Sequence, residues 1–436
     1  MESLIITGTA ILVALAILVS YIVRFARRDR ADRARRDEAV ALGVERPAVQ
    51  HPIIDEIRCI GCGSCVAACP EGDVLGVVAG RAVIVNGLRC VGHGRCEEVC
   101  PVGAIRIGLG EVAGRDDIPL LSPARETSVP GLYVAGELGG FSLIRNAVHD
   151  GRAIIEHMIS APGAGSPDLD LLIVGGGPAG LTAALAARQH GLRCTVIDQQ
   201  GPGGTILQYP RKKLVLTQPV EIPLYGTLAL NEYTKEAMLE IWLSLLRQFE
   251  IELRHPERVT AVRRMNGHFE VRSTRASYRA RHVILAMGRR GTPRRLGVSG
   301  EDRPKVAYQL KDAGAYHDHD ILVVGGGDSA VEAAMALARQ PGNRVTLSYR
   351  RPKLVRVRRR NEERITPLLE SGAIRGCFGS EVRAIGARSV RLASGPGEFD
   401  IANDFVFILA GGEPPFALLR EAGVAFASSP PPAGTV

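Results

Sequence analysis

The sequence predicts an α/β fold in which two parallel-sheet units follow a small α+β domain and one membrane-crossing helix. Three observations lead to this expectation: an uncharged apolar run at residues 4–23, two related cysteine motifs within residues 59–100, and two strand–glycine–helix patterns. The length of 436 residues suits several domains, and 46% hydrophobic residues exclude a largely disordered chain. The net charge is only +8, with part of the excess in one N-terminal run, so no nucleic-acid partner is expected.

The first predicted element is a transmembrane anchor at residues 1–24. The run from Leu4 to Val23 is uncharged and would span about 30 Å as a helix, the thickness of a bilayer's hydrocarbon core. Residues 24–36 then hold seven Arg and two Asp, and positive charge marks the cytoplasmic side. We therefore expect a single pass through the cell inner or plasma membrane, with the lipid bilayer as a partner and the soluble domains in the cytoplasm. A cleaved signal peptide is the alternative, but no basic residue precedes the run.

Residues 25–51 are predicted to form a basic juxtamembrane helix and a linker. Ala, Arg, Asp and Glu continue the helical pattern to about Val44, and prolines at 47 and 52 then break it. The arginines are interpreted as a topology signal that also contacts lipid headgroups.

The next predicted element is a cysteine-rich domain at residues 52–110. Its first motif is Cys59-x2-Cys62-x2-Cys65-x3-Cys69-Pro70, and a second, Cys90-x5-Cys96-x3-Cys100-Pro101, repeats it 31 residues later (59 to 90, 65 to 96, 69 to 100). Cysteines at this spacing hold iron–sulfur cubes. The repeat resembles the bacterial two-cluster ferredoxins, a small α+β fold. The resemblance implies that Cys59, Cys62, Cys65 and Cys100 bind one 4Fe–4S cluster and that Cys69, Cys90 and Cys96 bind a second.

One position departs from this repeat, because His93 stands where a cysteine is expected. Imidazole can replace thiolate on iron, and a neutral ligand raises the reduction potential. Three interpretations stay open: His93 completes an atypical second 4Fe–4S cluster, three cysteines hold a 3Fe–4S cluster, or no second cluster forms. A zinc site is disfavoured, since zinc sites use paired Cys-x2-Cys motifs.

The first glycine-rich pattern predicts a dinucleotide-binding turn. An apolar strand, Leu169–Val174, runs into GGGPAG, a helix follows, and a second strand ends at Asp198. The glycines allow a tight turn and close approach of a pyrophosphate to the helix N-terminus, and the acid would accept hydrogen bonds from ribose hydroxyls. The alternative is a glycine-rich turn without a ligand. The predicted cofactor-binding residues are Gly175, Gly177, Pro178, Ala179, Gly180 and Asp198.

The second glycine-rich pattern lies at residues 320–339 and predicts a nicotinamide-nucleotide site. The strand Asp320–Val324 leads into GGGDSA and a helix, but the next strand is followed by Arg350 and Arg351 instead of an acid. A guanidinium fork suits a 2′-phosphate, so we expect NADPH, with NADH as the alternative. The arginines from 356 to 360 are interpreted as a solvated basic face. The predicted cofactor-binding residues are Gly325, Gly327, Asp328, Ser329, Ala330, Arg350 and Arg351.

Together these motifs resemble the FAD- and NAD(P)-dependent flavoproteins of the thioredoxin-reductase type. The likeness covers about residues 111–426 and includes ILAMGRRGTP around Gly288 and TSVPGLYVAGE, which ends in Gly136 and Glu137. It implies Rossmann-like FAD and NADP domains, contacts of Gly136 and Glu137 with the flavin, and a homodimer. The nearest likeness is to members without paired redox cysteines, such as small-thiol disulfide reductases and ferredoxin–NADP reductases.

The order of the segments differs from that of this family. TSVPGLYVAGE is the last piece of the FAD domain there, but here it precedes the first glycine turn. We infer a circular permutation, with a vestigial duplicate as the alternative. The predicted segments are 111–160 for the permuted C-terminal piece of the FAD domain, 161–167 for a linker, 168–295 for the FAD domain, 296–400 for the NAD(P) domain, 401–426 for the return strand of the FAD domain, and 427–436 for a disordered tail.

These parts predict an oxidoreductase that passes electrons between NAD(P)H, FAD and the clusters. The redox partner is a protein carrier, a quinone or a disulfide, and the sequence does not choose the direction. Hydride transfer needs no acid or base from the chain, so no catalytic residue is assigned. Disulfide reduction is the first alternative, although residues 306–318 contain no cysteine and the remaining Cys194 and Cys377 lie in predicted strands. A redox sensor without turnover is the second.

Overall fold

The structure is a computed structural model, and it describes residues 2–47, 49–110, 115–160, 168–211, 213–216, 219–230, 232–289 and 291–428. The predicted linker at 161–167 and the tail from 429 onward lie outside the described residues. The chain divides into two compact units, one formed by residues 1–110 with 358–360 and the other by the remaining residues.

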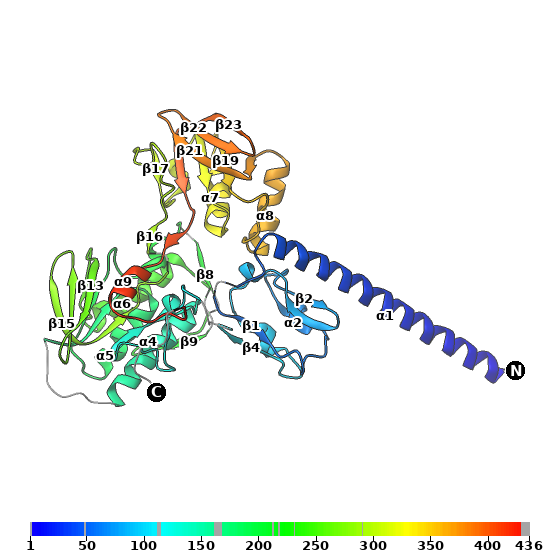
Figure 1. The fold of residues 1–436 in the computed structure, drawn as a ribbon, viewed down its shortest axis with the longest axis horizontal. Coiled ribbons are helices and arrows are strands. Elements are labelled where there is room, and N and C mark those ends of the chain that lie inside the picture. Colours follow the sequence, from blue (N-terminus) through cyan, green and yellow to red (C-terminus); the bar gives the residue numbers. More distant parts are fainter. Residues whose placement is uncertain are drawn as a thin grey trace. The chain divides into compact units, whose positions relative to one another are not determined.

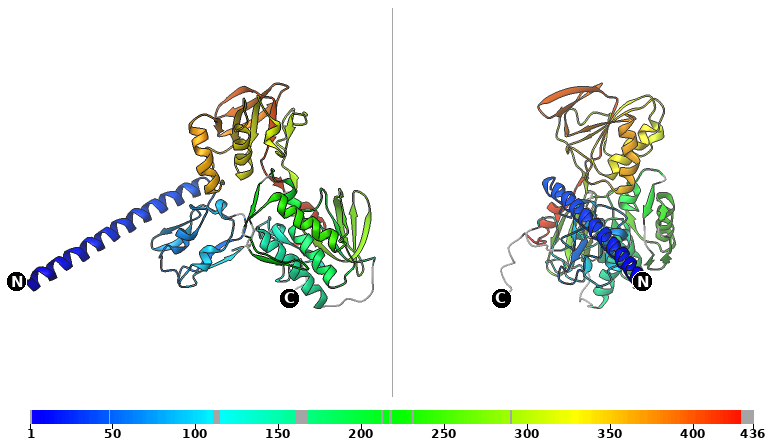
Figure 2. Two further views of the ribbon diagram at one scale, coloured as in Figure 1. Left: turned by 180° about the vertical axis from the view of Figure 1, so that it is seen from behind. Right: turned by 90° about the vertical axis from the view of Figure 1, so that its right-hand side faces the viewer.

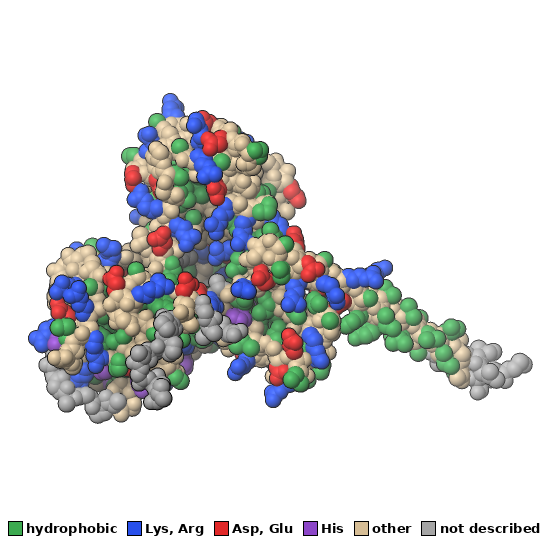
Figure 3. Space-filling view, viewed as in Figure 1, with side chains coloured by type: hydrophobic (Ala, Val, Ile, Leu, Met, Phe, Trp, Pro, Cys, Tyr) green, Lys and Arg blue, Asp and Glu red, His purple; other side chains and the backbone are tan. Residues whose placement is uncertain are grey.

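The first unit begins with a single uninterrupted helix, α1 (Glu2–Ala41). The predicted anchor and juxtamembrane helix are therefore continuous, and the sequence pattern had placed the end of the helix close to its observed position. Among the described residues this is the one helix that is long and apolar enough to cross a membrane, by length and composition alone. Hydrophobic side chains cover its projecting part (Figure 3), and those from Ile11 to Phe25 are exposed.

The rest of the first unit is a small α+β body with two antiparallel strand pairs. Strand β1 (His51–Ile54) pairs antiparallel with β4 (Ile105–Gly108), so the beginning and end of the body lie together. Strand β2 (Leu75–Val78) pairs with β3 (Arg81–Ile84). Short helices α2 (Ser64–Ala68) and α3 (Arg95–Glu98) follow Gly63 and Gly94, the corresponding positions of the two cysteine motifs, and η1 (Gly87–Arg89) precedes the second motif. The core contains Val74, Leu75, Ala82, Ala104 and Ile105 together with cysteines from both motifs.

The second unit is built around a mixed sheet with the strand order β12-β7-β6-β15-β14-β13. Strands β6 (Leu169–Val174), β7 (Cys194–Ile197) and β12 (Leu253–Arg254) are parallel to the end of β15 (Ser277–Leu285), whereas β13 (Val259–Arg264) and β14 (Phe269–Ser273) are antiparallel. The parallel strands are almost wholly apolar because both faces are covered. Helices α4 (Ile144–Ser160) and α5 (Pro178–Gln189) pack side by side (Figures 1 and 2).

The next parallel strand of this sheet comes from a segment earlier in the chain. Strand β5 (Leu132–Val134) pairs in parallel with Val283–Leu285 of β15, on the side opposite β6, although it precedes β6 in sequence. The segment before β5 also contacts the C-terminal part of the chain, since the Leu120 amide donates to the Ala425 carbonyl at 2.9 Å. In the family's usual segment order, these two parts of the chain would be consecutive. Helix α9 (Phe416–Glu421) and Phe426 belong to the core of this sheet.

A subsidiary layer follows β7 and packs around the single tryptophan. It consists of η3 (Gly204–Gln208), β8 (Leu214–Leu216), β9 (Val220–Ile222), β10 (Gly226–Leu228), β11 (Glu232–Thr234) and α6 (Lys235–Gln248). Thr234 caps α6 by accepting the Ala237 amide at 3.1 Å. Trp242, fully buried, fills the centre of this layer.

A second parallel sheet has the order β17-β24-β18-β19-β20. Its strands are β17 (Val306–Ala307), β18 (Asp320–Val324), β19 (Arg344–Tyr349), β20 (Ile374–Phe378) and β24 (Phe405–Ile408), with η4 (Ala313–Ala315), α7 (Asp328–Ala338) and α8 (Arg359–Glu370) between them. A three-stranded antiparallel sheet, β21 (Ser380–Ile385), β22 (Ser389–Ser394) and β23 (Gly397–Ala402), completes this part.

The observed pairing corrects one predicted boundary. Residues 401–426 were predicted to return to the first sheet, but β24 pairs with β17 and β18 of the second. The return begins only at β25 (Gly412–Glu413), which pairs with β16 (Thr292–Pro293). The sequence of an apolar strand does not indicate which strands it pairs with, so the sequence alone did not show to which of the two sheets β24 belongs.

Candidate redox cofactor sites

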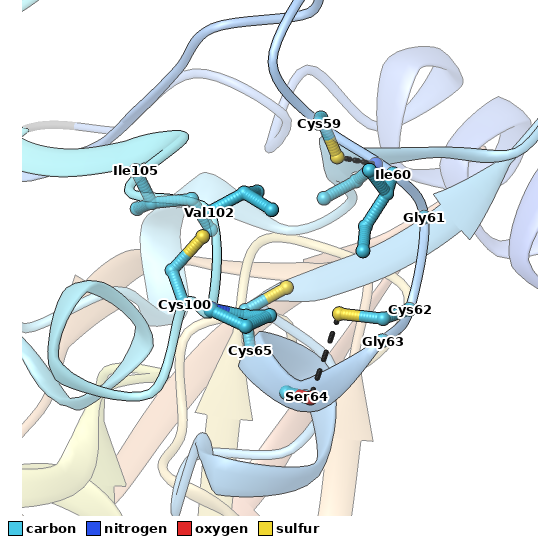
Figure 4. A pocket seen from close by; sticks show the side chains of 12 residues that line it. Cys59, Ile60, Gly61, Cys62, Gly63, Ser64, Cys65, Cys100, Val102 and Ile105 are labelled. Carbon is cyan, nitrogen blue, oxygen red and sulfur yellow. Dashed lines mark hydrogen bonds between the residues drawn. The ribbon is translucent and has the colours of Figure 1, made fainter.

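Four cysteines from the two cysteine motifs of the first unit converge on one pocket, which we call the first cysteine site. Cys59, Cys62 and Cys65 come from the first motif, and Cys100 comes from the end of the second. Their sulfur atoms point toward a common space, with Ile60, Val102 and Ile105 around it (Figure 4). The structure thus brings together the four residues that the ferredoxin resemblance assigned to one cluster.

Hydrogen bonds prepare these sulfur atoms for negative charge. The amides of Ala82 and Ala104 donate to the sulfur atoms of Cys59 and Cys100 at 3.3 and 3.2 Å. The Ser64 hydroxyl lies 3.5 Å from the sulfur of Cys62 and lowers the pKa of that thiol. The loop between the ligands needs glycine, since Gly61 and Gly63 have positive φ and a Cβ at Gly61 would overlap the carbonyl of Gly80.

The remaining motif residues line another pocket, the second cysteine site. Cys69, Cys90 and Cys96 lie there with His93, as the repeat predicted. The Arg95 amide donates to Nδ1 of His93 at 3.3 Å, which leaves that nitrogen without a proton. Glu71 also lines this pocket, a neighbour that sequence reasoning missed because a Cys-Pro-Glu sequence carries no recognisable ligand pattern.

Burial separates the two sites electrostatically. In the second cysteine site, desolvation raises the pKa of Cys90 to about 11 and that of Cys96 to about 12. In the first, burial raises the pKa of Cys65, but Cys62 is exposed. Because metal ligation requires the thiolate, a metal group that binds at the second site would have to displace these thiol protons.

The spacing of these ligands suits an iron–sulfur cube better than a zinc ion. Among the described residues, no three His, Cys, Asp or Glu side chains converge closely enough to hold one metal ion. Zinc bonds of about 2.3 Å would bring tetrahedral sulfur ligands within roughly 4 Å of one another. A cube of irons and sulfides holds its cysteine ligands further apart than a single ion does.

The first glycine turn lies between β6 and α5. Gly175 has φ +117°, and a Cβ there would overlap the carbonyl oxygen of Ala286 at the end of β15. A Cβ on Gly180 would overlap the carbonyl of Gly175, so helix and turn touch through backbone alone. The N-cap of α5 is Gly177, so no side chain accepts the first backbone N–H groups of the helix, and Pro178 and Ala179 follow it. This bare helix start fits a dinucleotide pyrophosphate.

Asp198 has a role that the sequence analysis did not foresee. Its carboxylate accepts backbone N–H groups from Gly176, Gln200 and Gly201, each at 2.7 Å. The side chain is buried and ties the glycine turn to the loop after β7. Since a carboxylate has about four acceptor positions, little capacity is left for ribose hydroxyls, and the predicted ribose contact stays a prediction.

Residues 136 and 137, which follow β5, lie beside this turn, because a Cβ on Gly136 would be 3.4 Å from the Cβ of Ala179. Gly136 begins η2 (Gly136–Gly139) directly after β5, and its amide donates to buried Asp150 at 3.0 Å. Helix α4 reaches α5 closely, because a Cβ on Gly151 would overlap the Ala179 carbonyl. Glu137 is half-buried in η2, and Gly288 follows β15 with φ +66° and open space around it.

The second glycine turn has the same construction between β18 and α7. A Cβ on Gly325 would lie 2.5 Å from the Leu409 carbonyl oxygen. Gly327 caps α7 without a side-chain bond and has open space beside it, which leaves room for a phosphate. The three following residues, Asp328, Ser329 and Ala330, form the first turn of α7, and Asn361 holds Asp328 with a hydrogen bond of 2.7 Å.

The two arginines predicted to select NADPH directly follow β19. Arg350 is exposed and Arg351 is half-buried in the loop after this strand. The Arg351 carbonyl accepts the Gly379 amide at 2.9 Å, which fixes this loop against the next strand. The end of β19 is where an acid would contact the ribose of NADH.

Cys194 and Cys377 lie in strands of different sheets, β7 and β20. Burial raises the pKa of Cys194 to about 11 and also raises that of Cys377. Neither has the lowered pKa or the neighbouring cysteine of a disulfide-exchange site.

Comparisons with known proteins agree with this division of the chain. A model of a 4Fe-4S dicluster domain matches residues 51–101, and a model of the pyridine nucleotide-disulphide oxidoreductase family matches residues 172–433. The second match begins after β5, so it leaves out residues that lie in the same sheet.

Individual relatives are reductases. A bacilliredoxin reductase of Bacillus subtilis (strain 168) is 30% identical over 58% of this chain and 80% of its own length. A ferredoxin–NADP reductase of Ignicoccus hospitalis is 36% identical over 42% of this chain, which spans only 56% of that relative. The solved bacillithiol disulfide reductase of Bacillus cereus is 27% identical, with a TM-score of 0.55, over 59% of this chain and 82% of the other.

These relatives identify the chain as an oxidoreductase enzyme with a 4Fe–4S domain. Since the larger match covers more than half of the chain, the protein belongs to the pyridine nucleotide-disulphide oxidoreductase family.

Proposed function

We propose that this protein is a membrane-anchored oxidoreductase that passes electrons between NAD(P)H, FAD, two iron–sulfur clusters and a redox partner. The observation that carries the proposal is the presence, in one chain, of two bare glycine turns and two pockets lined by cysteines. When bound, the flavin would exchange hydride with the nicotinamide and single electrons with the clusters.

The chain's own contribution is to bind and orient these groups. The turn at 175–180 offers backbone N–H groups and no side chains to a pyrophosphate, and Asp198 holds the turn in shape. Gly136 and Glu137 follow β5 at the end of the same sheet, where the family resemblance puts the flavin. The first and second cysteine sites would each hold one cluster, with His93 as the fourth ligand of the second.

Disulfide reduction is the second candidate, favoured by the likeness to bacillithiol disulfide reductases. That activity would use the flavin directly on a small disulfide, because the nucleotide-binding part of the sequence has no paired cysteines. Disulfide reduction by the flavin alone would give the two cysteine sites no role in the reaction, so we prefer electron transfer.

An anaerobic titration of the purified full-length protein with NADPH tests the proposal. We expect the flavin absorbance to bleach and the EPR signals of reduced clusters to appear in the same titration. Bleaching without cluster signals would contradict electron transfer from NADPH and would favour reduction of a small disulfide, which can then be assayed directly. Absence of any bleaching would favour a redox sensor without turnover.

Arg350 provides a test of nucleotide selection. Arg350→Ala is expected to raise the KM for NADPH about tenfold or more, because a charge-assisted hydrogen bond contributes roughly 1.5–3 kcal/mol. The KM for NADH should change little. Steady-state oxidation of both nucleotides with an artificial acceptor measures the difference.

Arg356→Ala is the matched control, since Arg356 is exposed in the same basic stretch and was assigned to a solvated face. Equal effects of the two substitutions, or equal effects on NADPH and NADH, would show that the stretch acts only through its general charge.

A further inference from the structure

The helix α1 is fixed to the iron–sulfur body by side chains that begin directly after its apolar run. Ala26, Asp29, Asp32, Arg35 and Ala39 are less exposed than the residues between them, so one face of the helix packs on the body. Asp32 accepts the Val77 amide and Asp29 accepts the Ala79 amide, both at 2.6 Å. Arg35 pairs with Asp73 further along the helix.

These contacts fix which end of the iron–sulfur body lies nearer the N-terminus of α1. Going toward the N-terminus, the partners on the body are Asp73, Val77, Ala79 and finally Gly63, against which the Arg28 guanidinium lies. The Gly61 backbone packs on Gly80 at the tip of the β2–β3 hairpin. The loop from Ile60 to Gly63 and this tip therefore form the end of the body nearest the apolar run.

The rise per residue of an α-helix gives the distance along α1 between the apolar run and each of these contacts. Arg28 lies five residues beyond Val23, the last residue of the uncharged run, which corresponds to about 7.5 Å along a helix axis. The headgroup layer on each side of a bilayer is roughly 5–8 Å thick. If α1 spans the bilayer, the Gly63 loop lies at the outer edge of the headgroups.

The surface at this end has the composition of a membrane-contacting surface. Ile60 and Val102 border the first cysteine site and are 62% and 39% exposed. Ile57, two residues before Cys59, and Val99, which precedes Cys100, are 92% and 39% exposed. Exposed arginines at 24, 27 and 30 add positive charge on α1 at the level of the headgroups.

The second cysteine site is attached to the residues that follow the C-terminal end of α1. Gln50, which follows α1, donates to the Gly92 carbonyl at 2.9 Å, and Gly87 packs against residues 45–47. These attachments lie beyond the C-terminal end of the helix, at least 18 residues after Val23.

We propose that the end of the body that carries the loop from Ile60 to Gly63 rests on the lipid bilayer that holds α1, with the exposed side chains of Ile60 and Val102 beside the first cysteine site. This proposal rests on the membrane anchoring included in the proposed function. It puts the first cysteine site at the lipid surface, within reach of a redox partner confined to the membrane, and the second site away from it.

Relaxation measurements on the full-length protein in anionic liposomes test this arrangement. The liposomes contain a lipid whose headgroup chelates either Dy³⁺, which is paramagnetic, or La³⁺, which is not. The clusters are reduced with dithionite, and the microwave power that half-saturates each EPR signal is measured. Cys62→Ser and His93→Cys alter the signals of the first and second sites, respectively, and so assign them.

We expect Dy³⁺ to raise the half-saturation power of the first cluster several-fold over La³⁺ and that of the second far less. Asp32→Ala, which removes the attachment to Val77, should reduce this difference, whereas Asp37→Ala, exposed on the same helix, should not. Equal responses of the two clusters, or none, in protein that floats with the liposomes would overturn the docking proposal alone. Protein that does not float would overturn the anchoring and the docking together.

Discussion

Gly175→Ala is expected to abolish most FAD binding, lowering the flavin content of the purified protein at least tenfold. The residue has φ +117°, a conformation that costs a non-glycine residue about 1–2 kcal/mol or more. Its Cβ would also overlap the Ala286 carbonyl oxygen, which is held in the sheet because the Ala286 amide donates to Val174 at 2.7 Å. The turn must therefore move, and the pyrophosphate contact depends on its position. The ratio of flavin to protein absorbance measures the loss.

Gly191→Ala is the control for this substitution. Gly191 also has a positive φ, +68°, but a Cβ there would meet no atom within 4 Å, and it lies at the opposite end of α5. This variant should lose some thermal stability and keep its flavin. A Gly175→Ala protein that retains full flavin would show that the dinucleotide does not lie against this turn.

The parts of the sites that the sequence predicted are those encoded by local spacing. The glycine turns need particular residues within six positions, and each cysteine motif needs its ligands within about ten, so short stretches of sequence reveal both. The grouping of Cys100 with Cys59, Cys62 and Cys65 is a long-range feature, and only the likeness to ferredoxins supplied it.

The features that sequence reasoning missed depend on contacts between distant segments. Asp32 and Val77 are 45 positions apart, and nothing in an Arg-rich helix indicates that its acidic residues bind backbone amides of a hairpin. Asp198 similarly serves the backbone of Gly176, 22 positions earlier. In each case an ordinary charged residue finds an unpaired N–H that only the folded chain presents.

The second cysteine site provides the sharpest test of cluster identity. His93→Cys is expected to lower the midpoint potential of its cluster by on the order of 100 mV, because an anionic thiolate replaces a neutral imidazole and disfavours the added electron. Iron content should stay near eight atoms per chain, four for each cube. A redox titration followed by EPR measures the shift.

The alternatives for this site give different results with the same variants. If three cysteines hold a three-iron cluster, His93→Cys would add one iron per chain and His93→Ala would change nothing. If His93 is a ligand, His93→Ala would instead lose one iron and produce the EPR signal of an oxidised three-iron cluster. If no second cluster forms, iron content would stay near four atoms in every variant. His317→Cys adds an exposed thiol in the second unit and should leave potential and iron content unchanged. A potential that does not fall in His93→Cys would exclude imidazole ligation, because the charge of the ligand set would then be the same in both proteins.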